Sequence, residues 1–147
     1  MQYTLKRLMD VKPELGKELK QKCYAINGCC SAVHQELGAF LNEYMYQDAL
    51  QILLDEQQIP YTREYYFNVM FHGQQIQHKH YVDFLINDEI IVECKAVEKI
   101  CAEHRQQLWN YMRLTKKPIG ILCNFAPPID QIEHYYLDVA DGTMYLF

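Results

Sequence analysis

Two acidic side chains and a lysine stand in neighbouring apolar runs of the sequence. Glu93 and Lys95 lie two residues apart in the run 89–96, and because side chains alternate along a strand, they are expected to share a face. Asp83 lies in the preceding run, 81–86, and a turn at Asn87-Asp88 would bring it beside Glu93. Two neighbouring carboxylates raise each other's pKa unless a cation keeps both ionised. The pattern suits a divalent cation such as Mg²⁺, which takes few carboxylates and keeps several waters.

A buried ion pair without catalysis is the alternative interpretation of the same three residues. Lys95 would neutralise Glu93 or Asp83, because a buried charge is costly unless it is paired. The spacing D-x9-E-x-K is also short enough to arise by chance. These residues alone therefore leave both interpretations open.

A third acid is expected to point inward from a helix. In the predicted helix 41–57, Glu43 shares one face with the apolar residues Tyr46, Leu50 and Leu54. An acid at the head of an apolar stripe needs either a buried partner or a place in a site. Glu43 is therefore a candidate site residue.

Polar residues on another predicted helix, 101–116, point to the same site. Gln107 and Tyr111 share a face with apolar Leu108 and are expected to face the core, where their polar atoms need partners. The opposite face is expected to carry Arg105, Gln106, Trp109 and Arg113.

The elements that would position these residues follow from apolar periodicity and turn signals. Helices are predicted over 14–37, 41–57 and 101–116, strands over 61–71, 79–86, 89–96 and 119–125, and weaker strands near 132–138 and 143–147. A hairpin turn is predicted at His72-Gly73-Gln74. This order of elements predicts a single α/β domain, in which helices cover both faces of a mixed central sheet.

The composition describes a folded chain of one domain. The chain has 147 residues, and half of them are apolar. Its net charge of −5 does not by itself favour a nucleic-acid partner. Twelve of the fourteen basic residues lie in 1–22 and 95–117, so a positive face for a phosphate backbone remains open beside ordinary solvated helix faces. No transmembrane or secretory segment is expected, and a cytoplasmic location is the default.

The six cysteines are expected to be reduced and to act as small buried hydrophobes. They lie at positions 23, 29, 30, 94, 101 and 123, without a C-x-x-C pair or a zinc-finger histidine pair. No structural zinc or iron–sulfur site is therefore expected.

Taken in order, these residues resemble the PD-(D/E)xK nuclease superfamily, and within it the GxxExxY family. The resemblance spans about residues 25–127. The segments that carry it are SAVHQELG (31–38), LNEYMY (41–46), DAL (48–50), VDFLI (82–86), IVECKAVE (91–98), QLWNYMRLT (107–115) and NF (124–125).

The resemblance implies a restriction-endonuclease-like αβββαβ core over about 25–127, with a small β tail over 128–147. It implies that Asp83 and Glu93 bind Mg²⁺ or Mn²⁺ together with the backbone carbonyl of Cys94. Lys95 would position the attacking water and stabilise charge, and Glu43 would support the metal or its waters. Gln107, with Tyr111 behind it, would contact Lys95, a water or the scissile phosphate.

The activity implied is metal-assisted hydrolysis of phosphodiester bonds, with DNA as the substrate and no membrane. Basic residues of the 95–117 segment, Lys99, Arg105 and Arg113, would contact the nucleic acid. A homodimer that pairs through the β tail is a further possibility. The alternatives are a catalytically weak or silent module that binds nucleic acid or protein, and a structural α/β domain with ion-paired acids.

Three departures from the family pattern bear on these expectations. The GxxExxY motif calls for glycine at position 40, where this chain has Phe40, with Gly38 two residues earlier. Val82 stands where proline often precedes the first acid. Finally, no cysteine follows Cys123, so the iron–sulfur cluster of some relatives is not implied.

Overall fold

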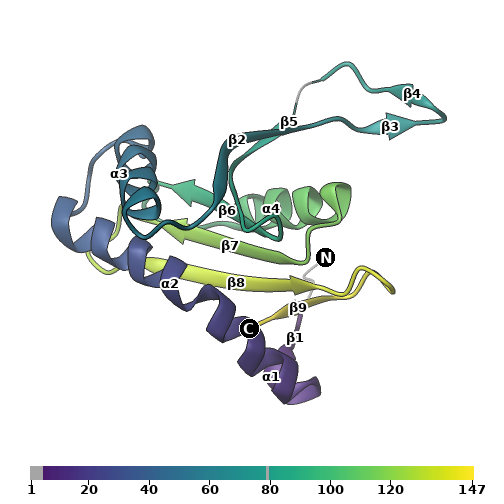
Figure 1. The fold of residues 1–147 in the computed structure, drawn as a ribbon, viewed down its shortest axis with the longest axis horizontal. Helices are drawn as coiled ribbons and strands as arrows, with labels where there is room; N and C mark the ends of the chain where they lie inside the picture. The colour runs from purple at the N-terminus through teal and green to yellow at the C-terminus, as the bar shows by residue number, and fades with distance from the viewer. Residues whose placement is uncertain (1–4, 79) are drawn as a thin grey trace.

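The computed structural model describes residues 5–78 and 80–147, so Lys79, where one predicted strand begins, lies outside the described residues. A seven-stranded sheet with the order β1-β9-β8-β7-β6-β5-β2 forms its centre (Figure 1). Its strands are β1 (Lys6–Arg7), β2 (Tyr61–Phe67), β5 (His80–Ile86), β6 (Ile90–Lys95), β7 (Ile119–Asn124), β8 (Gln131–Leu137) and β9 (Met144–Leu146). Two short strands, β3 (Met70–Phe71) and β4 (Gln74–Gln75), form a separate hairpin.

Helices pack on both faces of this sheet, which confirms the predicted α/β class. They are α1 (Leu8–Val11), α2 (Pro13–Leu37), α3 (Glu43–Glu56) and α4 (Ala102–Thr115). Buried residues of α2 and α3 form one apolar cluster with Val92 and Cys94 of β6, whereas α4 packs in a second cluster that contains Ile91. Because β6 is covered on both sides, five of its six residues are buried.

Local signals set the ends of the helices that lead to the site. Helix α2 ends at Gly38, whose φ of 75° suits glycine. Helix α3 begins after Asn42, whose side chain accepts a hydrogen bond of 3.0 Å from the Met45 amide. This cap makes Glu43 the first residue of α3.

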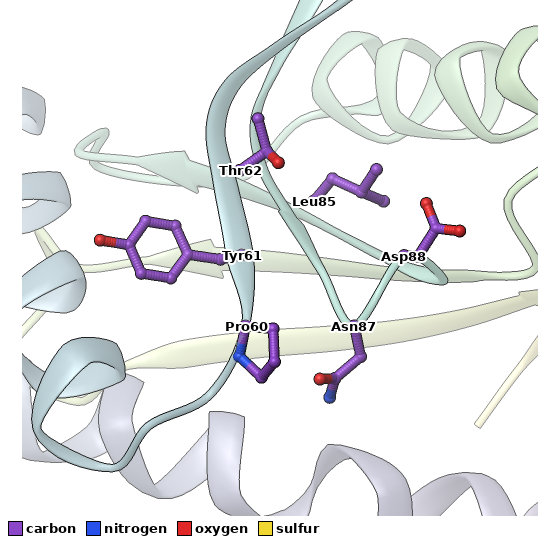
Figure 2. Close-up of a pocket in the computed structure, with 6 residues that line it drawn as sticks. All are labelled: Pro60, Tyr61, Thr62, Leu85, Asn87 and Asp88. Carbon is purple, nitrogen blue, oxygen red and sulfur yellow. The ribbon is translucent and has the colours of Figure 1, made fainter.

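A tight turn joins β5 to β6 as the sequence predicted. Asn87 and Asp88 have positive φ values of 52° and 58°, which asparagine and aspartate tolerate better than most residues. The Asn87 amide donates to the Pro60 carbonyl at 2.9 Å, so the turn is tied to the start of β2. Figure 2 shows this corner and the shallow pocket beside it, at the opposite end of β6 from Lys95.

Beyond the sheet, β2 and β5 continue into a projecting arm that ends in the β3–β4 hairpin (Figure 1). The predicted strand 61–71 is therefore wrong in part, because β2 ends at Phe67 and β3 begins only at Met70. The predicted turn near Gly73 is confirmed. Pairing of β5 with β6 extends only from Ile86 to Phe84, so Asp83 lies at the branch where β5 leaves β6.

The C-terminal strands belong to the central sheet. Strand β8 pairs antiparallel with β7, β9 pairs antiparallel with β8, and β1 runs parallel to β9. The sequence pattern missed β1 and α1, which are two and four residues long. Within the described part of the chain, no helix combines the length and apolar character needed to cross a bilayer.

Candidate active site

Asp83 and Glu93 face each other across the branch between β5 and β6. The Asp83 amide donates to Glu93 Oε1 at 3.0 Å, and the Cys94 amide donates to Asp83 Oδ2 at 2.8 Å. Each carboxylate thus accepts a hydrogen bond from a backbone amide of the other strand, at the point where the regular pairing of β5 with β6 stops. These bonds fix both acids side by side, and they use one oxygen of each carboxylate.

The pair is held in an environment that opposes ionisation. Burial raises the pKa of Asp83 above its usual value, and the nearby charge of Glu43 adds to the increase. Burial also raises the pKa of Glu93, which is only 5% exposed. The nearby charge of Asp83 raises the pKa of Glu93 further. A bound cation would relieve both effects, since it favours the ionised form of each acid.

Lys95 extends from β6 toward α4 rather than pairing with the acids. Its Nζ donates to Gln107 Oε1 at 3.3 Å, and Gln107 Nε2 donates to the Tyr111 hydroxyl at 3.2 Å. Among residues 5–78 and 80–147, no ion pair within 4.0 Å joins Lys95 to Asp83 or Glu93. The simple buried ion pair is therefore not the arrangement that this chain adopts.

The predicted faces of α4 are only partly right. Gln107 is exposed at the rim of the site instead of facing the core, and Trp109, expected on the outer face, is 9% exposed. Trp109 packs edge-on against Tyr135 of β8, with ring centroids 5.4 Å apart. The helix is therefore rotated relative to the predicted stripe, yet the link from Gln107 to Lys95 and Tyr111 is present.

Glu43 approaches the acids from α3. It accepts a hydrogen bond of 3.1 Å from Gln47 Nε2, and its charge contributes to the raised pKa of both Asp83 and Glu93. Sequence reasoning missed the residues that hold it there. Arg63 of β2 donates to Gln47 at 3.3 Å and to Asp48 at 2.6 Å, and the i, i+4 spacing of Glu43 and Gln47 was the only local signal.

Asn124, at the end of β7, is a second residue whose role the sequence did not reveal. It is fully buried and pairs in register with Lys95. Its side chain accepts from the Val97 amide at 3.1 Å and donates to the Val97 carbonyl at 2.8 Å. Asn124 therefore fixes the course of the chain just after Lys95, which orients the end of β6.

The three basic candidates have different surroundings. Arg105 forms a two-point ion pair with Glu133 of β8, with Nε and Nη2 each 2.8 Å from a carboxylate oxygen. Lys99, in the loop before α4, and Arg113, in its last turn, are exposed. Lys99 and Arg113 thus remain available to a phosphate, whereas Arg105 is engaged within the fold.

The cysteines fit the expectation of small buried residues with one exception. All six are free thiols; five are buried and Cys101, before α4, is exposed. The described residues contain no cluster of three or more His, Cys, Asp or Glu side chains at metal-binding separation. Asp83 and Glu93 supply two side-chain carboxylates as candidate donors, and two carboxylates suit an ion that completes its shell with water.

Comparison with known proteins identifies the superfamily and the fold of this chain. A family model described as the PD-(D/E)XK nuclease superfamily matches residues 6–135, which is most of the chain. Among solved structures, the crystal structure of SSO0001 is similar in fold, with a TM-score of 0.52 and 21% sequence identity. The match covers 67% of this chain and 52% of SSO0001, so this chain spans about half the length of SSO0001. No curated protein matches the sequence at a significant level. The strand branch that carries Asp83 and Glu93, the lysine two residues on and the match over residues 6–135 together place the chain in the PD-(D/E)XK nuclease superfamily.

Proposed function

We propose that this protein is a metal-dependent nuclease that hydrolyses phosphodiester bonds of DNA. The observation that carries the proposal is the pair of buried carboxylates, Asp83 and Glu93, held side by side with a raised pKa and without an ion-paired cation of the described chain. Such a pair is unfavourable as a purely structural feature at neutral pH. It becomes favourable when a divalent cation binds.

The residues fit a magnesium or manganese ion. Asp83 Oδ1 and Glu93 Oε2 are not used in the two amide bonds that fix the pair, so one oxygen of each is available as a hard ligand. The backbone carbonyl of Cys94, between Glu93 and Lys95, is the third protein ligand that we assign. When bound, the ion would activate a water and offset charge on the phosphate.

The surrounding side chains would then orient the reacting groups. The Lys95 ammonium, held by Gln107, would add positive charge where negative charge develops on the phosphate. Tyr111 would act as a positioning residue, because its hydroxyl accepts from the same Gln107 side chain. Glu43, held by Gln47, would accept hydrogen bonds from water in the site.

DNA as the substrate and membership of the GxxExxY family are proposals that rest on the sequence motifs. Glu43 and Tyr46 stand at the Glu and Tyr positions of the motif. Tyr46 is fully buried, and its hydroxyl donates to the Gly38 carbonyl at 2.6 Å. This bond ties α3 to the end of α2 and so supports the position of Glu43. The exposed Lys99 and Arg113 would contact the phosphate backbone.

The test is cleavage of supercoiled plasmid DNA by the purified protein with Mg²⁺ or Mn²⁺. Nicking is expected for the wild type, and Asp83→Asn and Lys95→Ala are each expected to reduce the rate by about 10²-fold or more. Glu36→Gln removes an exposed acid from α2 and should cleave like the wild type. Thermal unfolding gives a second readout, because Mg²⁺ should raise the melting temperature of the wild type but not of Asp83→Asn.

The outcomes separate the three interpretations. DNA binding without metal-dependent cleavage would overturn the nuclease and support the silent binding module. Neither binding nor cleavage, together with no effect of Mg²⁺ on the melting temperature, would support the structural domain. Cleavage that survives Asp83→Asn would also contradict the proposal, since it would come from another centre.

A further inference from the structure

An apolar pocket lies at the end of β6 that carries Lys95. It has a volume of about 530 Å³, and its lining includes Phe40, Leu41, Ala96, Pro127 and Pro128. Ala96 is covalently bonded to Lys95, and Leu41 lies two residues before Glu43. The pocket, called here the Phe40 pocket, therefore lies at the same end of β6 as Lys95.

Phe40 adopts a conformation that a phenylalanine rarely keeps without a reason. Its φ is 71°, in the left-handed region where a bulky side chain is strained. Its side chain is 88% exposed, so burial of the ring does not offset the strain. The chain thus holds an aromatic ring at the surface, at the same end of β6 as the proposed site, where glycine would fit the backbone better.

The walls around this ring are fixed in place. On one side, the Tyr46 hydroxyl accepts from the Leu41 amide at 3.2 Å, and its ring stacks on Phe125 with centroids 4.8 Å apart. On the other side, His34 Nε2 lies 2.6 Å from the Pro127 carbonyl oxygen. Loops anchored in this way form a pocket that exists before a ligand binds, which lowers the entropic cost of binding.

The lining selects the part of a nucleotide that fits. Glu98 is the one ionisable residue among the lining residues, and its carboxylate would repel a phosphate. The same carboxylate can accept hydrogen bonds from the exocyclic amino group of a base. An exposed aromatic ring with apolar neighbours suits the flat face of a base.

We propose that the Phe40 pocket binds an unpaired nucleobase of the strand whose phosphodiester lies at Asp83 and Glu93. This inference rests on the proposed function and adds a substrate class, single-stranded nucleic acid or a strand with an unpaired end. The base stacks on the Phe40 ring, and Glu98 accepts from its amino group. Bases within an intact duplex are paired and stacked on their neighbours, so they cannot enter the pocket without being extruded.

The test compares the affinity for a fluorescein-labelled 12-nucleotide single strand with that for a blunt 12-base-pair duplex. Fluorescence anisotropy is measured with Ca²⁺ in place of Mg²⁺. Phe40→Ala is expected to weaken single-strand binding about tenfold or more, whereas Phe40→Trp should retain it. Duplex affinity should change less than twofold in both variants. Tyr24→Ala is the matched control. Tyr24 is also an exposed aromatic residue, at 74%, but it lies on α2 about four turns before the end of that helix.

Two further measurements test whether Phe40 and Glu98 contact the base rather than only support the fold. Phe40→Gly relieves the backbone strain, so its melting temperature should not fall although its single-strand affinity does. The wild type should also prefer an oligo-dC strand, whose bases carry an amino group, over oligo-dT, and Glu98→Ala should remove that preference.

Failure of this inference differs from failure of the nuclease proposal. If Phe40→Ala binds the single strand as tightly as the wild type while Mg²⁺-dependent cleavage of DNA persists, the base pocket is overturned and the nuclease remains. If Phe40-dependent binding is found but the wild type never cleaves, the pocket remains as a binding site and the nuclease is overturned.

Discussion

At the scale of single residues, the acid pair at the strand branch disfavours folding of the metal-free protein, although the proposed activity requires it. Asp83 and Glu93 are buried together, and burial disfavours the charged form of each. The fold therefore carries an electrostatic cost that a bound cation would offset. Active centres commonly keep such strained or repulsive groups at the expense of stability.

Asp83→Asn is therefore expected to stabilise the metal-free protein. The amide oxygen of asparagine can still accept from the Cys94 amide, while the substitution removes one of two neighbouring buried charges. We expect the free energy of unfolding to rise by about 1 kcal/mol at pH 8 in the presence of EDTA. Urea unfolding measures this change, with Glu36→Gln as the control for loss of an exposed charge. A less stable Asp83→Asn would contradict the repulsion argument.

The convergence of Asp83 with Glu93 could be predicted because the signals for it are local. Alternation along β6 and the turn at Asn87-Asp88 suffice to bring the two acids together. The conformation of Phe40 could not be predicted in the same way, because its positive φ depends on how α2 and α3 meet. The link from Arg63 to Gln47 joins residues on different elements and leaves no periodic signal.

At the scale of elements, α4 is attached to the sheet by a side-chain ion pair as well as by apolar packing. Arg105 of α4 contacts Glu133 of β8 through two parallel hydrogen bonds, the geometry that gives an arginine–carboxylate pair its directionality. Burial alone would raise the pKa of Glu133, but the hydrogen bonds from Arg105 and Tyr135 outweigh it and lower the pKa below its usual value. The pair therefore stabilises the fold only while Glu133 is ionised.

Glu133→Gln is expected to destabilise the protein in a manner that depends on pH. A carboxylate whose pKa is lower in the folded state stabilises the fold above its unfolded pKa, and that contribution is lost as pH falls through the folded value. The variant should therefore be about 1–2 kcal/mol less stable at pH 7, and the difference should shrink below about pH 4.5. Urea unfolding over this pH range tests the prediction, and a constant difference would contradict it.

The ion pair between Arg105 and Glu133 also bears on the expectation that Arg105 contacts nucleic acid. The basic segment 95–117 pointed to three phosphate contacts, but charge density in a sequence does not reveal which cations already have partners. Glu133 lies 28 residues from Arg105, on a strand that the sequence signalled only weakly. Packing of Trp109 on Tyr135 likewise turned α4 away from the face that its apolar stripe predicted.

At the scale of the whole molecule, the central sheet and the arm are separable parts. The two apolar clusters lie on the faces of the central sheet, whereas Met70 and Phe71, near the tip of the arm, are 59% and 66% exposed. The arm begins where β5 leaves β6, so the branch that forms the acid pair also directs two strands away from the core. The order of helices and strands predicted the sheet, but it revealed neither the arm nor the irregular backbone at Glu64, whose φ is 54° within β2.

A variant with a shortened arm should fold as stably as the wild type. The Ile76 amide donates to the Val69 carbonyl at 2.8 Å, so replacing residues 70–75 with Asn-Gly would close a two-residue turn on an existing bond. Because the removed residues are exposed, we expect the melting temperature to change by less than about 3 °C, the shift that roughly 1 kcal/mol causes in a chain of this size. A larger fall would mean that the tip supports the core, and unchanged plasmid cleavage would further indicate that the acid pair is formed by the sheet alone.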